Sequence, residues 1–306
     1  MADVTVDEAV DETNIAHRVR AMYRRHPFPT AQRKNSYRHH ARYVHRFLDE
    51  LGVDPAGKRF GDIASGTGLM MLDYCREFPD TEFVGFDLSD ASVARANETL
   101  RSEGVNNGRC EVQDILGLDV AGEFDYILSW GTIHHLADSW LGVQKLCRAL
   151  KPGGVLRAGV YGRYGNWERR IQQEIARVVT AGFDPDDFAP RIEVVREWAR
   201  GDRNFKNYYT APPVDLEDDD WVVDEFLHVW EQHLALRDVV NWLQGEGMEI
   251  LRLTDYYDQE ISLDIADHST SQPFIDRVKG LPFEEQCHVI EMIARPYWLS
   301  VFARKP

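Results

Sequence analysis

The segment Asp62-Ile-Ala-Ser-Gly-Thr-Gly68 has the composition of a loop that brings its backbone against a ligand. It follows a short predicted strand and opens an amphipathic helix over residues 69–78. Glycines let backbone N–H groups approach a ligand without a Cβ in the way. A dinucleotide fingerprint would need a small residue where Met71 stands, and the loop has no phosphate-binding lysine of the P-loop kind. Asp62, four residues before the first glycine, instead suits a ligand that carries an amino group.

This loop resembles motif I of the class I S-adenosylmethionine (SAM) methyltransferases, written D/E-x-G-x-G-x-G. Ala64 replaces the first glycine of the motif, and because alanine is the smallest change we expect a slightly altered turn with SAM binding retained. Together the similar segments cover about residues 58–161. The later ones follow in the family's order: Val84-Gly85-Phe86-Asp87, Val112-Gln113-Asp114-Ile115, Phe124 to Trp130 with His134-His135-Leu136, and Ala149 to Leu156.

The resemblance implies SAM-binding roles for residues at or just past the ends of predicted strands. Asp87 would accept hydrogen bonds from both ribose hydroxyls, and Asp114 would bind the adenine amino group. Ser129 and Trp130 would lie near the methionine portion. Ordinary turn geometry or strand-end packing is the alternative for each of them. The full set implied for SAM binding is Tyr23, Asp62, Ala64, Gly66, Gly68, Asp87, Leu88, Gln113, Asp114, Ile115, Ser129 and Trp130.

Tyr23 and Pro27-Phe28-Pro29 resemble an element that precedes the core in a subset of bacterial family members. There it would fold over SAM as a lid whose rings exclude water; packing at a helix end is the alternative. The resemblance also implies the candidate catalytic residues, which would lie near the acceptor: Tyr161, Tyr164, Asn166, His134 and His228. For the two histidines, roles as a backbone partner in a turn and as a helical core residue remain open.

Alternating periodicity predicts strands at 59–63, 81–86, 109–113, 124–129 and 154–161, with helices at 68–78, 89–103 and 138–150 between them. Two further helices, at about 6–25 and 37–51, precede them. This alternation indicates an α/β fold with a doubly wound, mostly parallel sheet and a ligand at the carboxyl ends of the strands. The family core also requires a helix, a sixth strand and an antiparallel seventh strand, which we place at 236–245, 248–254 and 297–304. The sheet would therefore have seven strands.

Four regions follow from this organisation. Residues 1–57 would form an N-terminal helical lid, 58–161 the SAM-binding core, 162–233 a helical insertion, and 234–306 the C-terminal part of the core. The last region contains a second insertion, at 255–296, with a helix at about 283–294. Long insertions after strands usually lie over the ligand and serve as lids or substrate modules. A homodimer formed through the insertions is the alternative.

Composition narrows the class of protein further. The chain has 306 residues, 43% of them hydrophobic, and a net charge of −16, which argues against nucleic acid or anionic membrane as partners. It has no long apolar run and no visible signal peptide, so a cytoplasmic protein is expected. Cys75, Cys110, Cys147 and Cys287 show no paired spacing and are expected to be buried. Neither His nor Cys shows metal-ligand spacing, so we expect no metal site.

A basic segment interrupts the acidic chain. Residues 17–46 contain nine Arg or Lys and no Asp or Glu. They either dock an anionic substrate or neutralise the acidic body. The sequence thus predicts a SAM-dependent methyltransferase that acts on a small, anionic metabolite by in-line displacement. The alternatives are an intramolecular cyclase that uses the aminopropyl part of SAM, and a protein or peptide methyltransferase.

Overall fold

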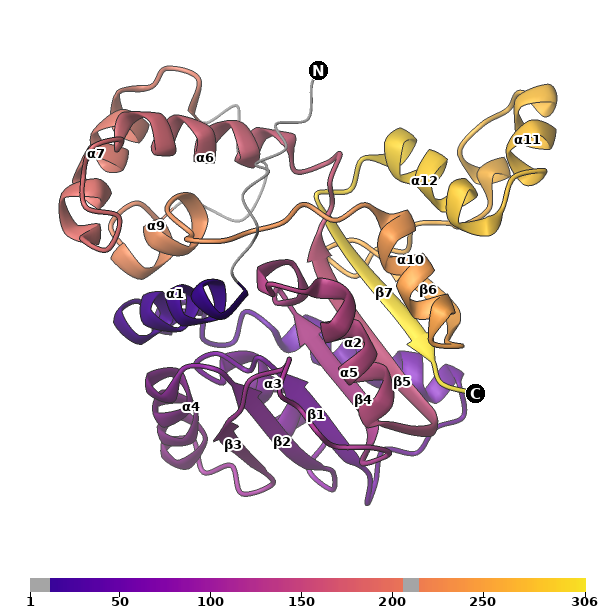
Figure 1. Ribbon diagram of the computed structural model, residues 1–306. Helices are drawn as coiled ribbons and strands as arrows, with labels where there is room; N and C mark the ends of the chain where they lie inside the picture. The colour runs from indigo at the N-terminus through magenta and orange to yellow at the C-terminus, as the bar shows by residue number, and fades with distance from the viewer. Residues whose placement is uncertain (1–11, 206–214) are drawn as a thin grey trace.

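A computed structural model describes residues 12–205 and 215–306, and its centre is a seven-stranded sheet in the order β3-β2-β1-β4-β5-β7-β6 (Figure 1). Strand β7 runs antiparallel to both β5 and β6, and the other pairs are parallel. The predicted doubly wound, mostly parallel sheet is confirmed. The strands are β1 Arg59–Ile63, β2 Glu82–Asp87, β3 Gly108–Val112, β4 Phe124–Trp130, β5 Leu150–Tyr161, β6 Glu249–Thr254 and β7 Trp298–Arg304.

Strands β1 and β4 pair with each other in parallel, and the strand order reverses between them. From β1 the chain proceeds outward to β2 and β3, and then returns to the other side of β1. Connections that leave in opposite directions open a crevice at the carboxyl ends of these two strands. The loop at residues 62–68 lies at this point.

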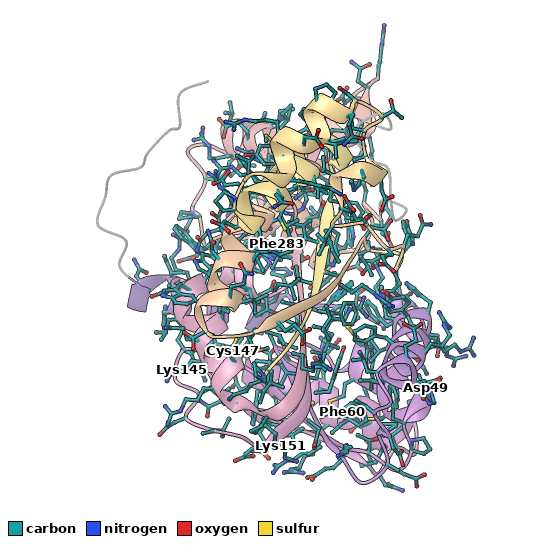
Figure 2. All side chains as sticks on the ribbon, turned by 90° about the vertical axis from the view of Figure 1, so that its right-hand side faces the viewer. Asp49, Phe60, Lys145, Cys147, Lys151 and Phe283 are labelled. Atoms are coloured by element: carbon teal, nitrogen blue, oxygen red, sulfur yellow. The ribbon has the colours of Figure 1, made fainter. Side chains whose placement is uncertain are left out.

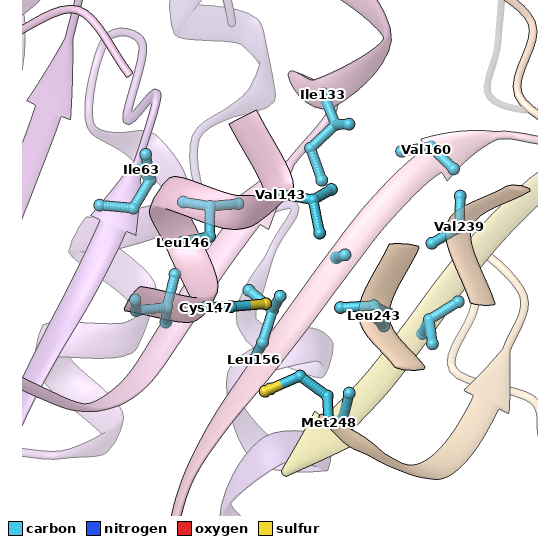
Figure 3. Close-up of a cluster of buried hydrophobic side chains, with 14 of the residues drawn as sticks. Ile63, Ile133, Val143, Leu146, Cys147, Leu156, Val160, Val239, Leu243 and Met248 are labelled. Atoms are coloured by element: carbon cyan, nitrogen blue, oxygen red, sulfur yellow. The ribbon is translucent and has the colours of Figure 1, made fainter. Parts of the chain in front are cut away.

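Helices cover both faces of the sheet. Side chains alternate along β4, so that Tyr126 and Leu128 pack on one face and Ile127 on the other. The first face carries α2 Arg38–Glu50, α3 Leu69–Glu77 and α4 Asp90–Ser102, and the second carries α5 Ser139–Ala149 and α10 Leu236–Gly245. Asp49 of α2 and Lys145 of α5 mark the two sides of the sheet in Figure 2. Figure 3 shows how α5, β5 and α10 bury Leu146, Leu156 and Leu243 together.

The first insertion forms a helical cap of α6 Trp167–Val179, α7 Phe188–Gly201 and α9 Asp219–Phe226, with an apolar cluster of its own. Helix α1 Glu12–Arg25 lies between this cap and α4 (Figure 1), and its Met22 is buried in the cap's cluster. The part of the expected first helix that precedes Glu12 is outside the described residues. The cap therefore packs against the N-terminal segment as well as following β5 in the chain.

The second insertion contains η3 Ile265–Asp267, α11 Gln272–Lys279 and α12 Phe283–Ala294, and lies away from the cap in Figure 1. Its buried Glu291 on α12 accepts hydrogen bonds from the backbone N–H groups of Leu236 (2.6 Å) and Arg163 (3.1 Å), which ties it to both ends of the first insertion. Two short turns, η1 Ala31–Arg33 and η2 Ile133–His135, complete the elements used below. Across 12–205 and 215–306, every helix is too short or too polar to cross a membrane.

Candidate active site

A cavity of about 250 Å³ lies at the carboxyl ends of β1, β2, β4 and β5, between the sheet, helix α1 and the cap. Its position is the one expected from the reversal of strand order. The sheet, helix α1 and the cap all contribute residues to the wall of this cavity. Of the residues that the sequence analysis connects with SAM, ten line it: Tyr23, Asp62, Ala64, Gly66, Asp87, Leu88, Gln113, Asp114, Ile115 and Trp130.

The loop after β1 is built from left-handed backbone conformations. Ala64, Gly66 and Gly68 have φ values of 66°, 52° and 76°. The N–H groups of Ala64 and Ser65 both donate to Phe86 O, at 2.7 and 2.9 Å, and so hold the loop against the end of β2. Ala64 thus takes the backbone conformation that glycine adopts without strain, at a cost of roughly 1–2 kcal/mol. The loop keeps its tight turn despite the missing glycine.

Asp87 connects the ends of β1 and β2. Its Oδ2 accepts a hydrogen bond from Gly66 N–H (2.9 Å) and its Oδ1 from Ser89 N–H (2.8 Å). Each carboxylate oxygen has a second lone pair, so both remain able to accept from a ligand hydroxyl. Burial raises the pKa of Asp87, and the two backbone hydrogen bonds oppose that shift. The geometry suits a diol lying across the end of β2.

Asp62 carries a buried oxygen that lacks a partner. The residue is 4% exposed, and no described residue donates to its Oδ2. Burial, and to a smaller extent the nearby Asp87 carboxylate, raises the pKa of Asp62 to about 7. Buried carboxylate oxygens normally have a donor. An ammonium group in the cavity would supply one and favour the charged form of Asp62.

The segment that follows β3 forms another part of the cavity wall, next to Asp62 and Asp87. Asp114 Oδ1 accepts from Leu116 N–H (2.9 Å), and Gln113 Nε2 donates to Asp114 O (3.0 Å), so the turn is held by its own side chains. Ile115, 5% exposed, and Leu116 also line the cavity. Acids and amides beside two aliphatic side chains suit a flat heterocycle with polar edges.

The comparison with known sequences decides the class of domain. Residues 61–154 match the family described as "Methyltransferase domain". This chain carries a class I methyltransferase domain. The matched segment runs from β1 into β5 and contains the strand-end residues Asp62, Asp87 and Asp114.

Individual relatives match different shares of the chain. An uncharacterized protein of Synechococcus sp. is 27% identical over 255 residues, which is 79% of this chain and 61% of the relative. The ubiquinone biosynthesis O-methyltransferase of Nitrobacter winogradskyi is 33% identical over 117 residues, 37% of this chain and 41% of that protein. The solved structure of PKMT2 from Rickettsia typhi in complex with AdoHcy has a TM-score of 0.63 at 15% identity, with 88% of this chain and 54% of that chain covered, and shows the shared fold. The chain thus spans less than two thirds of these relatives.

The N-terminal segment of the protein lies directly over the loop after β1. Phe28 O accepts a hydrogen bond from Thr67 N–H (3.2 Å), and Pro29 O accepts one from Thr67 Oγ1 (2.5 Å). Tyr23 OH lies 2.9 Å from Asp224 Oδ1, in cap helix α9, and 3.2 Å from His228 Nε2, just after that helix. The segment therefore joins the cofactor loop to the cap.

We expect Gly66→Ala to separate this segment from the loop. An added Cβ would lie 2.3 Å from Phe28 O and 3.1 Å from Pro29 Cδ. Gly57 is a matched control because it also has a positive φ, 70°, and a Cβ there meets nothing within 4 Å. Overpacking costs about 1–3 kcal/mol, so SAM should bind about tenfold or more weakly to Gly66→Ala than to Gly57→Ala. Calorimetric titration with SAM checks this; equal affinities of the two variants would contradict it.

Two SAM-associated residues lie outside the cavity wall. Gly68 lies where the start of α3 packs closely against α4, since a Cβ at Gly68 would lie 2.8 Å from the Cβ of Ala96. Ser129 is fully buried, and its Oγ has no partner among the described residues. Both stand behind the loop and strand that face the ligand. Their positions favour packing and backbone geometry over ligand contact.

Two of the five candidate catalytic residues line the cavity, and the other three do not. Tyr161 and Asn166 line the cavity, and Asn166 Nδ2 is buried without a described partner. Tyr164 points elsewhere, with its ring 5.5 Å from that of His288. His134 is fully buried behind the wall, and His228 contacts Tyr23 and the ring of His135 (3.9 Å) without lining the cavity. His135, its neighbour in the turn, does line it.

The sequence analysis missed an aromatic wall opposite the cofactor loop. Tyr37 from the start of α2, Tyr256 after β6, and Tyr297 and Trp298 at β7 line the cavity with Trp130. Trp130 and Trp298 have ring centroids 4.7 Å apart. One signal was available: an antiparallel β7 begins beside the end of β5, where Tyr161 pairs with Trp298. The first residues of β7 therefore had to lie at the cavity.

Among the described residues, four of the nine Arg and Lys of the basic segment face carboxylates of the protein itself, one of them being Arg38, 3.4 Å from Asp73. Arg24 pairs with Asp90 (2.9 Å), Lys34 pairs with Glu103, and Arg42 lies 4.0 Å from Glu77. Arg25 donates to Asp186 O (2.8 Å). Arg33, in the short turn η1, is different because it lines the cavity and no described carboxylate lies within ion-pair distance of it.

Proposed function

We propose that the protein binds SAM and transfers a methyl group to a small acceptor that carries an anionic group. The observation that carries this proposal is one cavity with two unlike halves. One half has the acids Asp62, Asp87 and Asp114 at the strand ends, and the other has Arg33 beneath the aromatic wall. The first suits the ammonium, ribose and adenine of SAM, and the second suits an aromatic or aliphatic acceptor with a carboxylate or phosphate.

When bound, SAM supplies an electrophilic methyl group on a positively charged sulfur. The residues of this chain hold the two reactants and exclude water. Tyr23 and Phe28 cover the cofactor loop from the N-terminal side, and the cap closes the opposite side. Positioning a nucleophile in line can supply much of the acceleration, so no fixed catalytic triad is required.

Tyr161 and Asn166 are the residues best placed to orient the acceptor. Tyr161 stands at the end of β5, and the guanidinium of Arg169 lies 4.2 Å from its ring centroid. Asn166 offers a buried amide N–H without a described acceptor. An oxygen atom of the methyl acceptor, placed between Tyr161 and Asn166, would accept a hydrogen bond from that amide. Arg169 itself is occupied, because it pairs with Glu225 (2.8 Å) and with Glu231.

The test is a screen of acceptors with S-adenosylhomocysteine release as readout. Carboxylated and phosphorylated small molecules should give turnover, and neutral analogues of the same size should give little. Methylthioadenosine formed from SAM without acceptor would support the cyclase alternative, and labelled protein substrates would support a protein methyltransferase. Either outcome, or NADH binding without SAM binding, would overturn the proposal.

Arg33→Ala is expected to raise the Michaelis constant for the acceptor about 10- to 100-fold while the turnover number changes little. A charged hydrogen bond of about 1.5–3 kcal/mol is lost, and it contributes equally to the ground state and the transition state. Arg42→Ala is the control, since Arg42 belongs to the same basic segment but is exposed and faces Glu77. Steady-state kinetics at several salt concentrations check both; an unchanged Michaelis constant in Arg33→Ala would refute the role of Arg33.

A further inference from the structure

Behind the cavity wall, three side chains converge in an arrangement that the chemistry above does not use. His134 and His135 come from η2 after β4, and Glu231 comes from the segment between α9 and α10. Each offers one ligand atom, and these atoms all lie within 4.8 Å of one another. In the sequence Glu231 lies almost a hundred residues after the two adjacent histidines, so spacing alone gave no sign of this cluster.

The cluster contains buried polar atoms that have no partner. His134 is 0% exposed, and neither its Nδ1 nor its Nε2 has a hydrogen-bond partner among the described residues. Glu231, with a side chain 5% exposed, likewise has an unpartnered Oε2. Buried polar atoms nearly always have partners, so several unpartnered atoms on two converging residues need an explanation. A bound cation would satisfy one ring nitrogen of His134 together with Oε2 of Glu231, and the second nitrogen of His134 would then carry the proton.

His135 and Glu231 each use one polar atom for a hydrogen bond within the protein, which leaves the other atom free to bind an ion. His135 Nδ1 lies 3.1 Å from Trp230 O, a carbonyl that can only accept, so the proton is on Nδ1 and the lone pair of Nε2 is free. Glu231 Oε1 accepts from Arg169, which leaves Oε2. Ligands whose second polar atom is fixed by a carbonyl or a charged group are typical of metal sites.

The backbone on both sides is also fixed. Gln232 N–H donates to His134 O (2.8 Å), and Gln232 Nε2 and Trp230 Nε1 donate to Leu136 O (2.8 and 3.2 Å). These hydrogen bonds hold the segment of Glu231 against the turn of the two histidines. The three ligand atoms are therefore preorganised, which lowers the cost of assembling a site.

The charge around the cluster leaves room for a cation. Asp224, Glu225 and Glu231 are all buried here, and Arg169 is the guanidinium that faces them. Burial raises the pKa of Asp224 to about 7, so Glu225 and Glu231 are the two carboxylates that share the single guanidinium of Arg169, which leaves one negative charge over. A divalent ion would offset it.

We propose that His134, His135 and Glu231 bind a divalent transition-metal ion, with Zn²⁺ as the ion that fits the ligand set. Two imidazoles and one carboxylate form a known catalytic zinc ligand set, whereas Mg²⁺ and Ca²⁺ prefer oxygen ligands throughout. Three protein ligands keep one coordination position open. His135 lines the cavity and His134 and Glu231 do not, so the ion would lie behind the cavity wall, next to the cavity. This site is independent of the proposed acceptor class.

The test measures metal content directly. The full-length protein is stripped with a chelator, dialysed against Zn²⁺, passed over a desalting column and assayed by plasma mass spectrometry. We expect one Zn²⁺ per wild-type chain, and an affinity about 100-fold or more lower in His134→Gln and Glu231→Gln, since even outer partners of a metal site are worth 10–100-fold. His45→Gln is the control, because His45 is a surface residue that faces Glu77.

Two results would overturn the proposal. One is a wild-type protein that retains no Zn²⁺; the other is equal Zn²⁺ retention by wild type and Glu231→Gln, which would indicate surface histidines as the source. In either case ordered water must satisfy the buried atoms. If the two variants fail to fold, Co²⁺-loaded wild type decides: a four-coordinate site gives strong visible d–d bands, and their absence, with no cobalt retained, counts against the site.

Discussion

Asp87→Ala is expected to lose almost all SAM affinity, with a dissociation constant about 100-fold or more above that of the wild type. The carboxylate would accept from two ribose hydroxyls, and each hydrogen bond to a charged group is worth about 1.5–3 kcal/mol. The substitution also removes the acceptor for Gly66 N–H (2.9 Å) and Ser89 N–H (2.8 Å). The cofactor loop would then lose its attachment to the end of β2.

Two further variants separate these effects. Asp87→Asn keeps one oxygen and should bind SAM with an intermediate affinity, whereas Asp119→Asn should match the wild type, since Asp119 is 78% exposed and pairs with Arg148 on the surface. Calorimetric titration with S-adenosylhomocysteine measures all three, and circular dichroism reports whether they are folded. A folded Asp87→Ala protein with wild-type affinity would remove the proposed site.

Arg157→Met is expected to lower the free energy of unfolding by about 3–5 kcal/mol, because it leaves a buried carboxylate without its cation. Arg157 on β5 has 0% exposure and pairs with Asp258, whose side chain is 5% exposed. Its Nε also donates to Ser300 Oγ (2.9 Å) and its Nη1 to Tyr74 OH (3.2 Å). Asp258 follows Tyr256 in the loop that carries part of the aromatic wall, so the substitution should also loosen the cavity.

An arginine on another strand of the sheet offers a control for this prediction. Arg252 on β6 pairs with Glu50, whose side chain is 56% exposed, so Arg252→Met should cost less than about 1 kcal/mol. Adding Asp258→Asn to Arg157→Met should recover part of the loss, because the uncompensated charge is then gone; asparagine also tolerates the positive φ of 63° at this position. Urea unfolding measures each variant. Equal losses for Arg157→Met and Arg252→Met would show that the buried pair contributes no more than a surface pair.

Much of the fold follows from local patterns in the chain. Every predicted strand agrees with an observed one to within a few residues, for example 59–63 with β1 Arg59–Ile63. Alternating and helical periodicities record which face of each element is buried, and this is a local property of the sequence. The same holds for the cofactor half of the site. Asp62, Asp87 and Asp114 could be found because the carboxyl ends of parallel strands meet at one edge.

The acceptor half could not be predicted in this way. Arg33, Tyr37, Tyr256 and Trp298 come from a turn, a helix start, a loop and a strand start that no common motif connects. Their meeting depends on how the insertions and the N-terminal segment pack, which is a matter of long-range contacts. Tyr164 shows the opposite error, since its position after β5 favoured the cavity but its ring turns toward His288.

The sequence by itself determined the class of fold and the order of the elements, and it led to the residues that we propose to bind the cofactor. Each of these depends on periodicity or on motifs within one strand and its following turn. Only the tertiary structure decided which of nine basic residues faces the cavity and which histidines lie together. Within residues 12–205 and 215–306, Arg33 has no carboxylate partner, whereas Arg24 and Lys34 have theirs. Glu231 reaches His134 only because the cap returns the chain to the turn after β4. Such meetings depend on the packing of distant segments, which leaves no local pattern in the chain.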